Sequence, residues 1–127
     1  MNRKHERIVN TANSEHYKWG DNCDAWHYMK NENLSVIREK MPEGTSEELH
    51  YHEKAQQFFY IINGVAEFEL DNNRFKAPQG SGIHIPPLTE HRIINIGASC
   101  LEFIVISHPI AHGDRRNLNN ETRNNNH

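Results

Sequence analysis

Short strands separated by turn residues are the feature that most limits how this chain can fold. From about residue 34 to residue 107, short apolar segments alternate with Gly, Pro, Asn and Asp. Residues 65–70, VAEFEL, place Ala66, Phe68 and Leu70 on one face, which is the two-residue period of a half-buried strand. Such strands at close spacing predict an all-β fold, an antiparallel sandwich or barrel.

Turn signals predict how neighbouring strands connect. Residues 58–62 are apolar at every position, so we expect this strand to be covered on both faces. Asn63-Gly64 separates it from residues 65–70, and Asn-Gly between two strands predicts a tight hairpin. Residues 1–20 fit either a short helix or an edge strand.

Length and composition exclude several classes of protein. The 127 residues fit one domain. A net charge of −3 without basic clusters argues against nucleic acid as a partner. No apolar stretch is long enough for a membrane span or a secretory leader, so we expect a cytoplasmic protein that does not bind membranes. Cys23 and Cys100 lie far apart in the chain, which favours free thiols.

Three histidines form the strongest chemical signal. His50 and His52 are one residue apart and point to the same face if they lie on a strand. His91 shares its parity with the apolar Ile93 and with Asn95, so we expect it to face inward. Three imidazoles suit Fe, Ni, Mn, Cu or Zn. The alternative is that they are ordinary surface or hydrogen-bonded residues, since the chain contains ten histidines.

Residues 44–64 and 80–95 together resemble the two motifs of the cupin superfamily, and specifically the small single-domain cupins. The matching landmarks are Gly44, His50, His52, Gly64, Gly80, Pro86, His91 and Asn95. The sequence departs from the motifs at Gln57, where the family has glutamate, and at Leu88, where it has glycine. The resemblance implies a double-stranded β-helix, the jelly-roll or cupin barrel, over residues 34–107. Residues 1–33 would then be an N-terminal edge segment packed on the barrel, and residues 108–127 a polar C-terminal tail.

The resemblance also implies one divalent metal ion, held by His50, His52, Gln57 and His91. An amide at position 57 keeps a coordinating oxygen but carries no charge and no titratable proton. The ion would be bound less tightly and would be a stronger Lewis acid, and a general base would have to come from another residue. The alternative role for Gln57 is an internal hydrogen bond inside an empty barrel.

Glu48, Tyr51 and Glu90 are candidates for that base, although their parity relative to the histidines indicates that most of them face away. Leu88 in place of glycine predicts an altered turn before His91, because glycine there would allow a positive φ.

The ligand pocket is expected to be apolar, with the metal as its polar anchor. The predicted lining residues are Phe59, Ile61, Phe68, Ile93 and Phe103. Beyond the pocket, His84 is predicted to be a surface or interface residue. Trp19, Trp26 and Tyr28 would pave a pocket or, as the favoured alternative, pack an edge strand in a dimer. Residues 114–116, Asp-Arg-Arg, would cap the barrel, bind a ligand carboxylate or, as we expect, form a solvated run of charge.

The sequence therefore predicts a metal-binding small cupin, expected to form a homodimer. It would act on or bind a small oxygenated or sugar-like molecule, with dioxygenase or isomerase chemistry at the metal. One alternative is a non-catalytic module that binds or senses a ligand through the metal, and another is a metal-free structural barrel. The sequence identifies neither the substrate nor the catalytic residues nor the metal.

Overall fold

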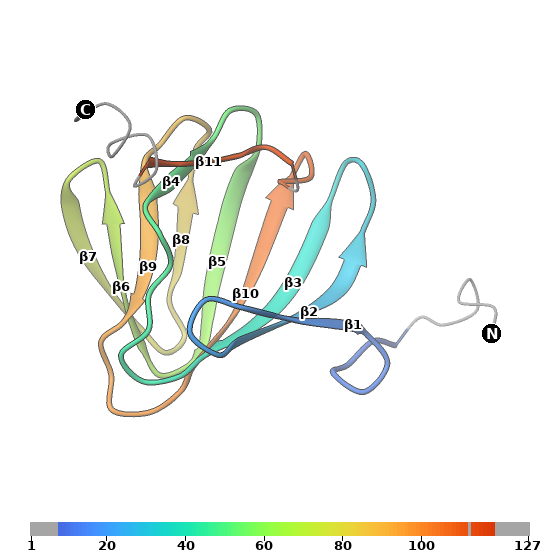
Figure 1. Cartoon of the computed structure of the whole chain (residues 1–127), viewed down its shortest axis with the longest axis horizontal. Coiled ribbons are helices and arrows are strands. Elements are labelled where there is room, and N and C mark those ends of the chain that lie inside the picture. Colours follow the sequence, from blue (N-terminus) through green and yellow to red (C-terminus); the bar gives the residue numbers. More distant parts are fainter. Residues whose placement is uncertain (1–7, 112, 119–127) are drawn as a thin grey trace.

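The fold consists of two antiparallel sheets packed face to face, as seen in a computed structural model that describes residues 8–111 and 113–118. The six-stranded sheet has the order β1 (Glu15–Trp19), β2 (Cys23–Lys30), β3 (Ser35–Met41), β10 (Leu101–His108), β5 (Gln56–Asn63) and β8 (Gly82–Ile85). The five-stranded sheet has the order β11 (Arg115–Asn117), β4 (His50–His52), β9 (His91–Asn95), β6 (Val65–Leu70) and β7 (Asn73–Pro78). Figure 1 shows these strands curving around a common interior. The predicted all-β jelly-roll fold is confirmed.

The core lies between the sheets because each strand sends alternate side chains inward. In β6, Ala66 and Phe68 are fully buried, as the alternation of this segment predicts. The ring of Phe59 lies 5.2 Å from that of Phe68 and 5.5 Å from that of Phe103, measured between centroids. The contact with Phe68 joins β5 to β6 of the other sheet, and the contact with Phe103 joins β5 to its neighbour β10.

The predicted hairpin at Asn63-Gly64 is wrong, because β5 and β6 belong to different sheets. Gly64 turns the chain from one sheet to the other at a φ of +93°. A Cβ at this position would lie 2.9 Å from the carbonyl oxygen of Cys100, so only glycine fits. The hairpin lies one strand later, where Asp71 and Asn72, both at positive φ, connect β6 to β7.

The prediction that residues 58–62 are covered on both faces is also wrong for the single chain. Phe59 and Ile61 are buried, whereas Phe58 and Tyr60 are 43% and 46% exposed. The inner face of β5 packs against the five-stranded sheet, and its outer face is open.

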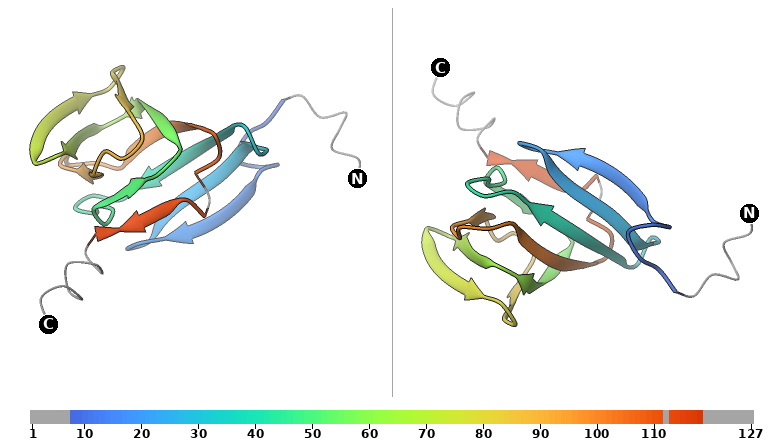
Figure 2. Two further views of the ribbon diagram at one scale, coloured as in Figure 1. Left: turned by 90° about the horizontal axis from the view of Figure 1, so that it is seen from above. Right: turned by 90° about the horizontal axis from the view of Figure 1, so that it is seen from below.

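Both ends of the described chain join the sheets. The β1–β2 hairpin continues the six-stranded sheet beyond β3 (Figure 2), so the edge-strand alternative holds for the described part of residues 1–20. At the other end, β11 pairs with β4 and crosses one end of the barrel in Figure 1. Residues 1–7, 112 and 119–127 of the two predicted terminal segments lie outside the described residues.

Candidate metal centre

Two neighbouring strands of the five-stranded sheet bring the three predicted histidines together. His50 and His52 lie on β4 and point inward. His91 lies on the adjacent strand β9, where it is paired with His50. One ring nitrogen from each imidazole lies within 4.8 Å of the others. All three side chains are buried, with at most 5% of any residue exposed. The alternative of ordinary surface histidines does not hold for these three.

Hydrogen bonds to backbone carbonyls fix the orientation of two of the rings. The Nδ1 of His50 lies 2.8 Å from the carbonyl oxygen of Glu48, and the Nδ1 of His91 lies 2.8 Å from that of Thr89. A carbonyl oxygen only accepts, so each Nδ1 must carry the proton and each Nε2 keeps its lone pair. The same arrangement orients histidine ligands in metal sites.

Burial keeps the three imidazoles neutral. The pKa is about 3 for His50 and His52 and about 4 for His91; burial is the largest cause for each, and repulsion from neighbouring rings contributes to the decrease for His52 and His91. At neutral pH all three lone pairs are therefore available to a cation.

Gln57 approaches the same cavity from β5 in the opposite sheet. Its Nε2 donates to the hydroxyl oxygen of Ser107 at 2.9 Å, which leaves the amide oxygen free of any hydrogen-bond partner. The Nε2 of His91 is likewise buried without a partner. Unpaired buried acceptors are unfavourable, and a divalent cation would satisfy both. The residues present therefore fit the metal that the sequence predicts.

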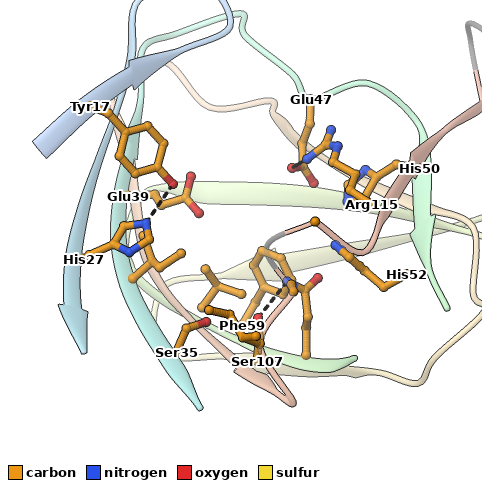
Figure 3. Close-up of a pocket in the computed structure, with 16 residues that line it drawn as sticks. Tyr17, His27, Ser35, Glu39, Glu47, His50, His52, Phe59, Ser107 and Arg115 are labelled. Atoms are coloured by element: carbon orange, nitrogen blue, oxygen red, sulfur yellow. Dashed lines mark hydrogen bonds and ion pairs between the residues drawn. The ribbon is translucent and has the colours of Figure 1, made fainter. Parts of the chain in front are cut away.

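A cavity of about 230 Å³ opens beside the histidines (Figure 3). Of the five residues predicted to line it, only Phe59 does. Ile61, Phe68, Ile93 and Phe103 belong instead to the packed core between the sheets. Alternation along a strand predicts which side chains point inward. It does not predict whether an inward side chain packs in the core or lines the cavity farther along the same strand. The floor of the cavity consists of Phe59 together with Ile37 and Val105.

Two acids in the cavity were missed by the sequence analysis. Glu39 points into it from β3 and Glu47 from the loop before β4 (Figure 3). Burial, followed by the charge of Glu47, raises the pKa of Glu39 to about 8, and burial raises the pKa of Glu47 against the pull of Arg115. The candidate bases Glu48, Tyr51 and Glu90 are absent from the described lining of this cavity.

The segment Asp114–Arg116 closes one end of the barrel, where β11 pairs with β4. Asp114 accepts hydrogen bonds from three successive backbone N–H groups, those of residues 53–55, at 2.9–3.2 Å. Arg115 lines the cavity, with its Nη1 3.5 Å from the Oε2 of Glu47. Arg116 pairs with Glu53 at the surface. The expected solvated run of charge is therefore found for Arg115 and Arg116, which are exposed, but not for Asp114, whose carboxylate is held by the three N–H groups.

Other residues of the two motifs have structural roles. Leu88 keeps the positive φ of the family glycine, at 66°, so the predicted change of turn is wrong. Its N–H donates to the carbonyl oxygen of His52 at 2.7 Å, which holds the turn against β4. The Nδ2 of Asn95 lies 2.9–3.1 Å from the carbonyl oxygens of residues 41, 42 and 99, and so fixes a loop. His84 is exposed and contacts Gln56, as expected for a surface residue.

Comparison with known proteins agrees with this geometry. The model of the cupin domain matches residues 37–107, more than half of the chain. The chain belongs to the cupin family. Residues of this cupin are 36% identical over 75 positions to the uncharacterized protein MJ1618 of Methanocaldococcus jannaschii, covering 59% of the chain and 60% of that protein. They are 31% identical over 62 positions to the polyketide synthase CurC of Streptomyces cyaneus, covering 49% of the chain and 40% of that protein.

Among solved structures, this cupin resembles PAC13 of Streptomyces, solved with uridine. The TM-score is 0.75 and the identity 18%, over 88% of this chain and 90% of that one. At this identity the likeness supports the fold alone. Both cysteines are free thiols, as predicted. No helix in the described part of the chain is long and apolar enough to cross a bilayer.

Proposed function

We propose that this cupin holds one divalent metal ion with His50, His52, His91 and Gln57, and that it acts there on a small oxygenated or sugar-like molecule. The observation that carries the proposal is the pair of buried, unpartnered acceptors, the Oε1 of Gln57 and the Nε2 of His91, beside the other two imidazoles. A bound ion of this kind supplies Lewis-acid chemistry and, if it is iron or copper, redox chemistry.

The residues of the chain prepare the site for a small polar ligand. The backbone carbonyls of Glu48 and Thr89 hold two imidazoles in one tautomer, so the site is organised before a ligand arrives. Gln57 adds an oxygen without charge, which leaves the centre electropositive toward an oxygen-bearing ligand. The apolar floor restricts water around that ligand.

Oxidoreductase or isomerase chemistry is the class that this site supports best. Gln57 has no titratable proton, so proton transfer falls to other cavity residues, of which Glu39 and Glu47 are the carboxyl groups. One fold neighbour was solved with uridine and one sequence relative is named a polyketide synthase, which agrees with a small-molecule ligand in general but does not bear on the reaction class.

We further propose that the protein is a cytoplasmic homodimer. Its two free thiols suit a reducing compartment. The open outer face of the six-stranded sheet carries exposed apolar side chains that a second copy would cover.

Elemental analysis by mass spectrometry tests the metal centre. We expect about one iron, nickel, manganese, copper or zinc ion per chain in the purified protein, and its loss in a His50→Ala/His91→Ala variant. The double variant His16→Ala/His84→Ala, which removes two histidines outside the cluster, should keep the ion. Protein without metal even after reloading would overturn the metal centre and leave a metal-free barrel.

A further inference from the structure

The cavity has two polar walls of different character, separated by its apolar floor (Figure 3). One wall carries His50 and His52, with Arg115 beside them, and Gln57 reaches the cavity from β5 in the other sheet. The other carries Glu39 with Tyr17 and His27, at a distance from the histidine wall. A ligand that fills the cavity must therefore satisfy polar groups at both of its ends.

The Glu39 wall is built for hydrogen-bond donors. Tyr17 and His27 flank Glu39, and the hydroxyl of Tyr17 lies 3.3 Å from the Nε2 of His27. A hydroxyl group can donate to a carboxyl oxygen of Glu39 and accept from a neighbouring side chain. A carboxylate placed there would be opposed by the like charge of Glu39 once Glu39 is ionised, and no arginine or lysine of the described lining lies on this side to compensate it. Burial, followed by the charge of Glu47, raises the pKa of Glu39 to about 8. The same surroundings would disfavour an added negative charge at this wall.

The histidine wall is the one that suits an anion. Among the described residues lining the cavity, Arg115 is the one arginine or lysine. Its Nε donates to Asn117 at 2.7 Å, its Nη2 donates to the carbonyl oxygen of Glu48 at 3.4 Å and its Nη1 lies 3.5 Å from Glu47, so part of the N–H donor capacity of the guanidinium is left for a ligand. The imidazoles are neutral, and Glu47 beside Arg115 offsets part of its charge, so the positive charge that would receive an anion here comes from Arg115 together with the proposed metal ion. The charges of the cavity therefore favour a ligand whose anionic end lies at the histidine wall.

Size limits the ligand further. At about 230 Å³ the cavity is smaller than sites for drug-sized molecules, which span about 300–1,000 Å³. Tyr17 and His27 come from β1 and β2, outside the residues that match the cupin domain. The wall around Glu39 therefore combines a residue of the matched barrel with two residues from the strands that precede it.

We propose that the ligand is a short hydroxy acid with a single carboxylate, bound with that carboxylate at the histidine wall and its hydroxylated end against Glu39. This proposal rests on the proposed metal centre and specifies the class of ligand that the centre takes. It excludes dicarboxylates of the same length, because their second carboxylate would face Glu39.

Two four-carbon acids test the proposal. 2,4-Dihydroxybutanoate and malate share the 2-hydroxy carboxylate and differ only at the far end, a CH₂OH group in one and a carboxylate in the other. Isothermal titration calorimetry on zinc-loaded protein should give at least about tenfold tighter binding of 2,4-dihydroxybutanoate. Both proteins are compared at pH 9, above the pKa of Glu39 at about 8, where Glu39→Gln should reduce the preference to about threefold or less, since the neutral amide does not repel a carboxylate. Glu43→Gln, the same change at an exposed loop position, should leave it unchanged.

Zinc content, measured on the same samples, separates the two proposals. If one ion per chain is present and malate binds as well as the hydroxy acid, if neither acid binds, or if Glu39→Gln keeps the preference, the ligand class is wrong and the metal centre stands. If no variant takes up zinc, the metal centre is wrong. The acids are then compared on metal-free protein, where the preference for the hydroxy acid and its loss in Glu39→Gln would still support the Glu39 wall, and absence of either would overturn it.

Discussion

At the scale of single residues, Gln57 sets the charge of the proposed metal centre. Gln57→Glu would add an anionic ligand while Ser107 reverses its hydrogen bond and donates to the new carboxylate. We expect zinc to bind about tenfold more tightly, which corresponds to about 1.4 kcal/mol. Competition with a chelating dye measures the affinity. Gln56→Glu adds the same charge at the exposed neighbouring position and should leave the affinity unchanged; equal effects of both substitutions would contradict coordination by Gln57.

Glu39 makes a separate prediction about stability and pH. Its pKa is about 8 in the folded protein, raised by burial and then by Glu47, against an ordinary value of 4.5. Between these values the folded state holds a proton that the unfolded state releases, so the stabilisation is full below pH 4.5 and is lost as the pH rises to 8. In the presence of a chelator, the melting temperature of Glu39→Gln relative to the parent should rise by several degrees between pH 5 and pH 8. A constant difference would mean that Glu39 ionises normally in the fold.

Residue parity explains which site residues the sequence could predict. His50 and His52 occupy alternate positions of one strand, so local alternation was enough to place them together. Glu39 shares its parity with Ile37 and Met41 within β3. A charged residue on an apolar face is unusual, and this could have identified Glu39 as a site residue. Glu47 lies in a loop, where no period applies, and only the tertiary structure places it in the cavity.

At the scale of elements, the residue just before β11 binds a loop that follows β4. Asp114 accepts from the N–H groups of residues 53–55, and although burial raises its pKa, these three donors hold it below the ordinary value. Asp114→Ala would leave the donors without this acceptor, and we expect a loss of ~1–3 kcal/mol in the free energy of unfolding. Urea denaturation measures it. Arg116→Ala, which breaks only the surface pair with Glu53, should cost about 0.5 kcal/mol or less; an equal loss in both variants would refute the role of Asp114.

Strands were easier to predict than the sheets to which they belong. The alternation in β6 and the apolar run in β5 both identified strands, because each pattern is local. The Asn63-Gly64 signal gave the wrong connection, since a glycine at positive φ serves a tight hairpin and a crossing between sheets equally well. What decides between them is pairing with β10 and β8 for one strand and with β7 and β9 for the other, and of these partners only β7 is adjacent in the sequence.

At the scale of the whole molecule, the outer face of the six-stranded sheet is the surface available for self-association. Ile106 pairs with Phe58 on β5 and with Val36 on β3, which in turn pairs with Met29 on β2. This outer patch, completed by Tyr60, includes four residues that are 37–46% exposed. Cross-strand neighbours share a face, so the patch is continuous across four adjacent strands, and a second copy would remove it from water.

Charge placed in this outer patch should therefore separate the subunits. We expect the parent to run as a dimer in size-exclusion chromatography with light scattering, and Phe58→Glu to weaken the dimer by about 2 kcal/mol or more, or about 30-fold in Kd. Phe75→Glu places the same charge at a 49% exposed phenylalanine of β7, in the other sheet, and should leave the dimer intact. Because the cavity lies on the inner side of the sheet, metal content should be unchanged in both variants. A monomeric parent, or dissociation by Phe75→Glu alone, would show that the exposed apolar side chains of β5 and β10 have another role.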